Sequence, residues 1–327
     1  MAGEHTVSVS VVVPTYNRSK RLPTLVEALA AQKGVGAFEV VFVDDASTDD
    51  TQLTLDRIAA DAPFPVTAVR QASNRGPAIG RNVGWRMARA PLICFTDDDC
   101  LPTDTWLAEM VAALGSNDVV QGRTMPNPAH EANRGPFSHT LTIGWEMGYY
   151  ETANMGYRRE VLERVGGFDE TFRYAYGEDC ELAWRAIDSG ATTYFADDAL
   201  VYHDITQSSW RTALRNTRRR EGMVQLFQRR PELRCRLGKG VFYEPTHLPA
   251  LVGIGCAVAL VQSPRAPARW AASAAVGLWY AKSCRRIRGR PRSRLGWLGV
   301  VPASFVVDVA DIGVLAQASI RYRTLQL

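Results

Sequence analysis

The sequence lacks the cysteine patterns of disulfide-stabilised proteins. Its six cysteines form no CxxC pair and no regular framework. The first ten residues, MAGEHTVSVS, do not have the features of a signal peptide. We therefore expect a reducing, cytosolic environment and no disulfide bonds. The 327 residues contain no evident internal repeat, and their apolar content is ample for a folded core.

The C-terminal third lacks an uninterrupted apolar run of the length that ordinary transmembrane helices need. Residues 248–262 and 270–281 are shorter than the roughly 20 apolar residues that cross a bilayer, and two aspartates interrupt residues 295–316. Interfacial or re-entrant helices fit this composition better, because tryptophans and the basic segment 285–294 flank the runs. A soluble helical subdomain or a dimer interface is the alternative.

Charge is distributed unevenly along the chain. The formal net charge is only +4, but acidic residues gather in the first two-thirds, whereas Arg and Lys crowd residues 211–239 and 282–294. This asymmetry predicts a catalytic part followed by a part that meets an anionic partner, such as a membrane surface or the diphosphate of a lipid-linked acceptor. A solvated helical face is the alternative. Nucleic acid is disfavoured because residues 210–239 lack interleaved aromatics and any recognised nucleic-acid module.

The first hundred residues alternate between strand and helix patterns. Apolar, mostly β-branched runs predict buried strands, and the segments between them carry helical spacing. Ser47 and Asp50 resemble a capping box that opens one of these helices. Such alternation predicts a parallel sheet with helices on both faces. The predicted strands cover residues 7–13, 38–43, 66–70 and 92–96.

Three polar clusters directly follow predicted strands: PTYNR at 14–18, DDAST at 44–48 and TDDDC at 96–100. Ligands of parallel α/β sheets bind outside the carboxyl ends of the strands, so we expect the clusters to converge on one rim. DDAST is either a turn with a helix cap or a carboxylate site for a nucleobase or ribose.

The run FTDDDC at 95–100 concentrates like charges where folding does not require them. Two such charges about 4 Å apart repel by roughly 4 kcal/mol at the effective dielectric of a protein surface. In an extended segment, Asp97 and Asp99 share one side and Asp98 points to the other. A D-x-D pair suits Mg²⁺ or Mn²⁺ held together with substrate phosphates, whereas a solvated acidic turn is the alternative.

Five stretches occur in order at 9–18 (VSVVVPTYNR), 40–51 (VVFVDDASTDDT), 74–102 (NRGPAIGRNVGWRMARAPLICFTDDDCLP), 154–170 (NMGYRREVLERVGGFDE) and 177–190 (GEDCELAWRAIDSG). Each motif is weak alone, but together they closely resemble family 2 glycosyltransferases with the GT-A fold. The resemblance implies a metal-dependent, inverting transfer of a sugar from a nucleoside diphosphate sugar to a hydroxyl acceptor.

The resemblance also implies contacts with the donor. The loop after the first strand and Asp45 would contact the base or ribose. Arg81 matches a basic position that meets the nucleotide, although Arg75 competes for that role. Asn154 would line the donor-sugar pocket, with a simple turn residue as the alternative. The implied donor-binding residues are Pro14, Thr15, Tyr16, Asp45, Arg81, Asp97, Asp98 and Asn154.

The metal site implied by the resemblance uses the last acid of the D-x-D motif. Asp97 would face the ribose and Asp99 would bind the cation, while Asp98 is an alternative ligand. His203, in the run VYHD, resembles a histidine that completes the metal site, although a lone histidine is more often structural. A mixed carboxylate and imidazole site suits Mn²⁺ somewhat better than Mg²⁺.

The catalytic residues implied by the resemblance are Asp179 and Glu178. Asp179 would act as the general base that removes the acceptor's proton, and Glu178 would contact the acceptor. An acidic helix N-terminus, stabilised by the helix dipole, is the alternative interpretation.

These observations predict an α/β, GT-A catalytic domain at 1–205, in which a Rossmann-like sheet is flanked by helices. Its nucleotide-binding half would cover about 1–100 and its acceptor-binding half about 101–205. Residues 206–327 would form a basic, apolar helical region that brings the enzyme to the inner face of the cell membrane, where a lipid-linked or cell-envelope acceptor is found.

A nucleotidyltransferase is the alternative function, but it would usually carry a Gly-rich basic loop after the first strand. A non-catalytic membrane-binding protein would not explain the five motifs.

Overall fold

A computed structural model describes residues 7–236, 240–289, 291 and 293–327. Its contacts divide the chain into two compact units. Unit 1 contains Met1–Ala129 and Thr140–Asp204, and unit 2 contains His130–His139 and Ile205–Leu327. The sequence did not predict that the segment 130–139 would group with the C-terminal residues. Parts of the predicted N-terminal domain and basic segments, residues 1–6, 237–239, 290 and 292, lie outside the described residues.

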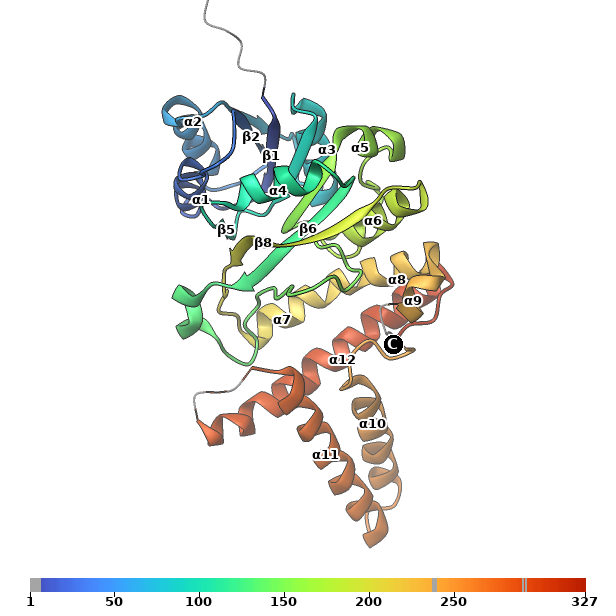
Figure 1. The fold of residues 1–327 in the computed structure, drawn as a ribbon. Coiled ribbons are helices and arrows are strands. Elements are labelled where there is room, and N and C mark those ends of the chain that lie inside the picture. The colour runs from blue at the N-terminus through green and yellow to red at the C-terminus, as the bar shows by residue number, and fades with distance from the viewer. Residues whose placement is uncertain (1–6, 237–239, 290, 292) are drawn as a thin grey trace, which may run out of the picture. The chain divides into compact units, whose positions relative to one another are not determined.

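Unit 1 is built on one mixed sheet (Figure 1). Its strands are β1 (Val9–Thr15), β2 (Phe38–Asp44), β3 (Val66–Arg70), β4 (Leu92–Thr96), β5 (Cys100–Pro102), β6 (Val119–Pro126), β7 (Asn154–Arg158) and β8 (Thr193–His203). They lie in the order β3-β2-β1-β4-β7-β6-β8-β5. The predicted parallel arrangement is confirmed for β1 to β4. The sequence did not predict β7 and β5, which run antiparallel to their neighbours.

Alternation along the central strands sends their side chains into two separate cores. Val11 of β1 and Phe42 of β2 face one core, whereas Val12 and Val43 face the other. Because both faces are covered, these strands carry apolar residues at successive positions, as at 11–13 of β1 and 40–43 of β2. The first core is covered by α1 (Leu22–Ala30), α2 (Thr51–Asp61) and α4 (Trp106–Leu114), and the second by α3 (Pro77–Met87), α5 (Arg159–Val165) and α6 (Glu178–Asp188).

Turns near the carboxyl ends of the strands place the polar loops. α5 ends at Gly166 in the left-handed conformation, at φ +82°, so the predicted closure of this helix by a glycine pair is confirmed.

The predicted capping box at Ser47 is wrong. α2 begins at Thr51 without a side-chain cap, and Ser47 Oγ instead accepts a hydrogen bond from Asn17 N at 2.8 Å. Ser47 therefore joins the loop after β2 to the loop after β1.

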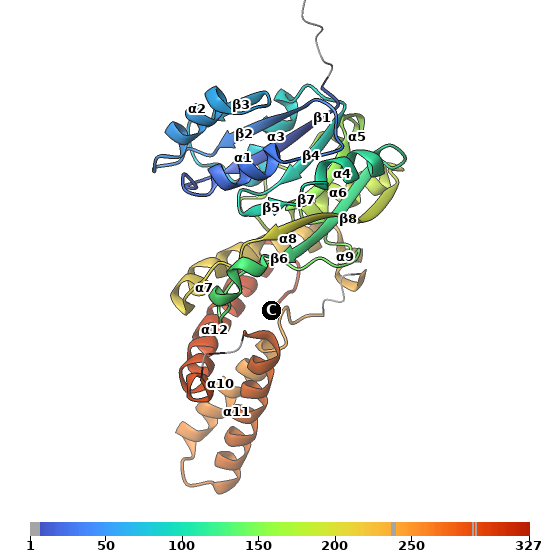
Figure 2. The same cartoon turned by 60° about the vertical axis from the view of Figure 1, so that its left-hand side comes forward.

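Unit 2 is helical, and the predicted apolar segments of the C-terminal third form its longest helices. Two of them, α10 and α11, lie side by side as a hairpin (Figures 1 and 2). Among the described residues, Arg294–Tyr322 is the one segment long and apolar enough to cross a membrane. The α-helices are α7 (Trp210–Asn216), α8 (Glu221–Arg229), α9 (Pro231–Arg236), α10 (His247–Gln262), α11 (Pro267–Ile287) and α12 (Trp297–Tyr322), and the short 3₁₀ helices of the chain are η1 (Pro128–Asn133), η2 (Thr217–Arg220) and η3 (Arg294–Gly296).

Candidate active site

The loops after β1, β2 and β4 meet at one rim of the sheet, as predicted. Arg18, in the loop after β1, links all three. Its backbone N–H donates to Thr51 Oγ1 at 2.8 Å, and its guanidinium pairs with Asp98 at 3.0 Å and Asp99 at 3.5 Å. Arg18 belongs to the motif PTYNR, but the sequence assigned roles only to its first three residues. Arg18 thus partly neutralises the negative charge of the acidic run, from the loop that follows the neighbouring strand β1.

The predicted alternation of the three aspartates is wrong. β4 ends at Thr96, and the acids lie in a turn closed by a hydrogen bond from Cys100 N to Asp97 O at 3.1 Å. Asp98 and Asp99 therefore share Arg18, while Asp97 turns away to pair with Arg81 at 2.8 Å. Strand alternation fails here because it applies only to extended backbone.

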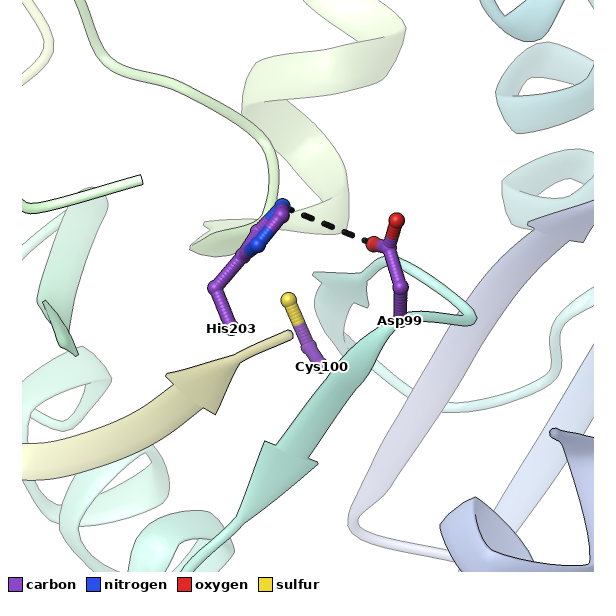
Figure 3. A group of neighbouring side chains, drawn as sticks. All are labelled: Asp99, Cys100 and His203. Carbon is purple, nitrogen blue, oxygen red and sulfur yellow. Dashed lines mark ion pairs between the residues drawn. The ribbon is translucent and has the colours of Figure 1, made fainter. Parts of the chain in front are cut away.

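Asp99, Cys100 and His203 offer three ligand atoms that all lie within 4.8 Å of one another (Figure 3). The antiparallel pairing of β5 with β8 places Cys100 directly opposite His203. His203 Nδ1 lies 2.8 Å from the carbonyl oxygen of Asp204, which can only accept, so Nδ1 carries the proton and the lone pair of the neutral ring is on Nε2. Nε2 lies 3.6 Å from Asp99 Oδ1.

This donor set fits a divalent cation. Imidazole, carboxylate and thiol ligands together suit borderline metals, and a histidine held through its second nitrogen is typical of metal sites. The structure brings together Asp99 and His203, as predicted, and adds Cys100, which the sequence missed. No sequence signal marks Cys100, because its place opposite His203 arises from the non-local pairing of β5 with β8. Asp98 is not part of this group. It is buried, and its burial together with the charge of Asp99 raises its pKa to about 7.

The two candidate catalytic carboxylates open α6 but differ in accessibility. Asp179 is half-buried and accepts hydrogen bonds from Cys180 N at 2.8 Å and Thr152 N at 3.4 Å. Glu178 is only 1% exposed, and its Oε1 binds Arg81 at 3.0 Å. In this structure the partner of Glu178 is Arg81, and the predicted contact of Glu178 with the acceptor stays a prediction.

Arg81 is a buried cation between two acidic groups. Its guanidinium binds Asp97 and Glu178, and although burial favours its neutral form, the charges of these acids raise its pKa. Burial, followed by the charge of Asp179, raises the pKa of Glu178 to about 8. Burial also raises the pKa of Asp179, while the charge of Arg81 opposes that rise. Arg81 thus favours the ionised form of the candidate base.

Glu151 is a further acid near Asp179 that the sequence did not single out. Its Oε2 accepts a hydrogen bond from Gln121 Nε2 at 3.2 Å, and it directly precedes Thr152, whose N–H contacts Asp179. Burial, followed by the charge of Asp179, raises the pKa of Glu151 to about 7. No motif marks this position, since it lies in a long loop whose path depends on tertiary packing.

The predicted nucleoside-binding residues lie on the loops after β1 and β2. Tyr16 is 43% exposed beside buried Thr15 and half-buried Pro14. Asp45 accepts hydrogen bonds from Gln71 Nε2 and from the backbone N–H groups of two residues of the next loop, at 2.8–2.9 Å. Those two residues are Arg75 and Gly76. Asp45 therefore fixes the loop that leads into α3, and its contact with a base or ribose stays a prediction.

Asn154 has structural partners, and its predicted place in a donor-sugar pocket stays a prediction. Its side chain is fully buried, and Oδ1 accepts from Trp106 Nε1 at 2.8 Å. Its Nδ2 donates to the carbonyl oxygens of Arg123 and Ala199 at 2.9 and 2.8 Å. All these hydrogen bonds tie β7 to its surroundings, so the amide has a structural role.

Two family profiles match the chain. The profile of "Glycosyl transferase family 2" matches residues 10–170, and that of "Glycosyl transferase family group 2" matches residues 92–283, which is more than half of the chain. The chain is a family 2 glycosyltransferase. The matched residues include the rim loops, Arg81, the acidic turn, Asp179 and His203.

Curated relatives of this glycosyltransferase share part of its length. A pre-mycofactocin glycosyltransferase of Mycobacterium tuberculosis is 29% identical over 212 residues, which are 60% of this chain and 42% of that protein. Glycosyltransferase AglE of Haloferax volcanii is 27% identical over 204 residues, 60% of this chain and 66% of that protein. The match thus spans less than half of the first relative and just under two-thirds of the second.

Solved structures of glycosyltransferases share the fold at low sequence identity. The mannosyltransferase PcManGT from Pyrobaculum calidifontis, in complex with GDP-Man and Mn²⁺, has a TM-score of 0.59 at 21% identity and covers 95% of this chain and 86% of its own. Residues 1–349 of S. aureus TarS, in complex with UDP-GlcNAc, give 0.54 at 19% identity and cover 97% of this chain and 93% of their own. The predicted GT-A fold is confirmed.

Proposed function

We propose that this glycosyltransferase moves a sugar from a nucleoside diphosphate sugar to a hydroxyl acceptor with inversion, and that a divalent cation assists it. The observation that carries the proposal is the rim itself. There, a half-buried carboxylate, Asp179, stands with a buried arginine and the group formed by Asp99, Cys100 and His203.

Asp179 is the general base of the proposed reaction. The acceptor oxygen forms a bond to the anomeric carbon while the bond from that carbon to the diphosphate breaks, and the acceptor proton passes to Asp179. Arg81 keeps a positive charge near Asp179, which favours the ionised carboxylate that a base requires. The backbone N–H groups of Cys180 and Thr152 orient that carboxylate.

Asp99 and His203, with Cys100 beside them, would hold the cation. A bound divalent cation, Mn²⁺ or Mg²⁺, supplies charge stabilisation to the leaving diphosphate. Arg18 lies beside that position, because it pairs with Asp98 and Asp99. Pro14, Thr15, Tyr16, Asp45 and Asp97 are the proposed nucleoside-binding residues.

We also propose that the enzyme works at the inner, cytoplasmic face of the cell membrane on a lipid-linked or cell-envelope acceptor. The support is the basic and apolar composition of residues 206–327 and the one segment long enough to cross a membrane among those described. Two relatives, the pre-mycofactocin glycosyltransferase and a chondroitin synthase of Pasteurella multocida, have names that refer to different molecules. The proposed acceptor class therefore rests on the composition of residues 206–327.

The test is incubation of the purified protein with a panel of nucleotide sugars and Mn²⁺, followed by measurement of nucleoside diphosphate release. Asp179→Asn should lower turnover by about 10² to 10⁴, the usual contribution of a positioned base. Asp188→Asn, at the exposed far end of α6, is the matched control and should keep full activity. Full activity of Asp179→Asn would refute the role of Asp179 as the general base. Full activity after chelation would refute the dependence on a divalent cation. In a parallel assay with a nucleoside triphosphate and a sugar phosphate, release of pyrophosphate would instead favour a nucleotidyltransferase.

A further inference from the structure

The segment that satisfies the length and composition of a transmembrane helix is tied into unit 2 by buried charges. Asp308 of α12 is 1% exposed and binds Tyr280 Oη at 2.6 Å and Arg288 at 2.8 Å. Asp311, 4% exposed, lies 3.4 Å from Arg220 Nε and 3.3 Å from His247 Nε2. Transfer of α12 into lipid would separate both acids from these partners and leave charges unpaired in hydrocarbon.

The hairpin of α10 and α11 has the opposite character. Its buried residues are confined to the start of α10 and the end of α11, next to the rest of unit 2. Beyond them, apolar side chains lie exposed on both helices, and Figures 1 and 2 show the far end of the hairpin without a covering element from unit 2. The most exposed are Val258 (53%), Val261 (83%), Trp270 (59%) and Leu278 (73%).

The charge of this region selects the partner. Between Glu244 and Asp308 the sequence contains no acidic residue but nine basic ones, two of which lie outside the described residues. A second copy of so basic a hairpin would be repelled, whereas an anionic lipid surface is complementary to it. Exposed tryptophans also suit the interface between headgroups and acyl chains.

We propose that the hairpin of α10 and α11 is the membrane anchor, that it binds an anionic leaflet, and that α12 stays outside the bilayer. The apolar part of α10, residues 248–261, is about 21 Å long, less than the roughly 30 Å of a hydrocarbon core, so α10 does not span the bilayer. Basic residues lie at both ends of the hairpin, Arg265 and Arg269 at the tip and Lys282 and Arg285 at the base. These basic residues are complementary to the phosphates of an anionic leaflet.

This inference rests on the proposed membrane location and specifies the segment that provides it. The test is co-flotation of the full chain with vesicles of 30% phosphatidylglycerol in phosphatidylcholine, compared with vesicles of phosphatidylcholine alone. We expect binding to the anionic vesicles only, and at least a tenfold loss of it in Val258→Asp/Leu278→Asp. The matched control is Leu298→Asp/Ile320→Asp, which changes two residues of α12 with exposures of 75% and 82% and should bind within twofold of the parent.

Three outcomes would overturn the inference: equal binding to both vesicle types, equal binding of the hairpin variant and the parent, and a greater loss in the α12 variant. Quenching by brominated acyl chains provides a second readout, and it should fall severalfold in Trp270→Phe/Trp279→Phe. Nucleoside diphosphate release, measured on the same samples, separates the two proposals. If the protein releases nucleoside diphosphate but does not float, the anchor is refuted and the proposed transfer reaction stands. If it floats but never releases nucleoside diphosphate, the proposed transfer reaction is refuted.

Discussion

Replacement of Arg81 by methionine tests the central electrostatic feature of the site. The side chain is 5% exposed and pairs with Asp97 and Glu178, so its removal leaves a buried carboxylate without a cation. Loss of one partner of a buried ion pair costs about 3–5 kcal/mol, and we expect no more than about 3 kcal/mol at pH 7, because Glu178, with a pKa of about 8, is then largely protonated and Asp97, 27% exposed, remains partly hydrated.

The pH dependence carries the sharper prediction. The pKa of Glu178 in the folded protein, about 8, exceeds the ordinary value of 4.5, so the parent loses stability as the pH rises from about 4.5 to about 8. Without Arg81 this folded-state pKa rises further, and the variant continues to lose stability above pH 8. The difference in unfolding free energy should therefore grow above pH 8 by up to about 1.4 kcal/mol per pH unit.

Urea unfolding of parent and Arg81→Met at pH 7, 8 and 9 measures this difference. The matched control is Arg86→Met on the same helix, where the pair with Glu170 is half-exposed and should contribute about 0–1 kcal/mol at every pH. A cost for Arg81→Met that stays constant or shrinks between pH 8 and 9 would show that Arg81 does not control the ionisation of these carboxylates.

Three further predictions concern single residues. The pH profile of kcat/KM should rise at a higher pH than the ordinary pKa of an aspartate would give, and Glu151→Gln should move that rise to lower pH, because loss of its charge lowers the pKa of Asp179; an unchanged midpoint would contradict the coupling. His203→Ala should weaken Mn²⁺ binding in the presence of a nucleoside diphosphate by roughly tenfold or more, as measured by the spin resonance signal of free Mn²⁺, and equal affinity would remove His203 from the site. Asn154→Ala should lower the free energy of unfolding by about 3 kcal/mol through unsatisfied buried groups; parental stability would contradict this structural role, and a raised donor KM would support the predicted role in the donor pocket.

The fold of the first hundred residues followed from the sequence because each element there has a local signature. The strand Phe38–Asp44 has an apolar run at 40–43, and the helix Leu22–Ala30 has apolar residues at the spacing of one face. The second half of the sheet was harder. β5 is three residues long and pairs with β8 a hundred residues later, and a non-local antiparallel contact of that kind leaves no periodic pattern.

The site was predicted in part for the same reason. Asp99, His203 and Asp179 carry recognisable motifs, and the structure places the first two together. Arg18, Cys100 and Glu151 were missed because their importance arises from which strand ends and loops come close in space. The burial of Asn154 and Glu178 was not predicted, because a residue type alone does not fix how deep its side chain lies in the fold.

The grouping of residues 130–139 with the C-terminal unit has a consequence for how the chain can be divided. His139 N donates to Thr206 O at 3.0 Å, and Arg288 stacks on Phe137, so this short segment completes its contacts only when residues far downstream are present. During synthesis, residues 130–139 can complete their contacts only after the ribosome has released the C-terminal third of the chain, which contains Arg288. A version cut after residue 204 would leave that piece uncovered, and the catalytic unit is better isolated by replacing 130–139 with a short polar linker.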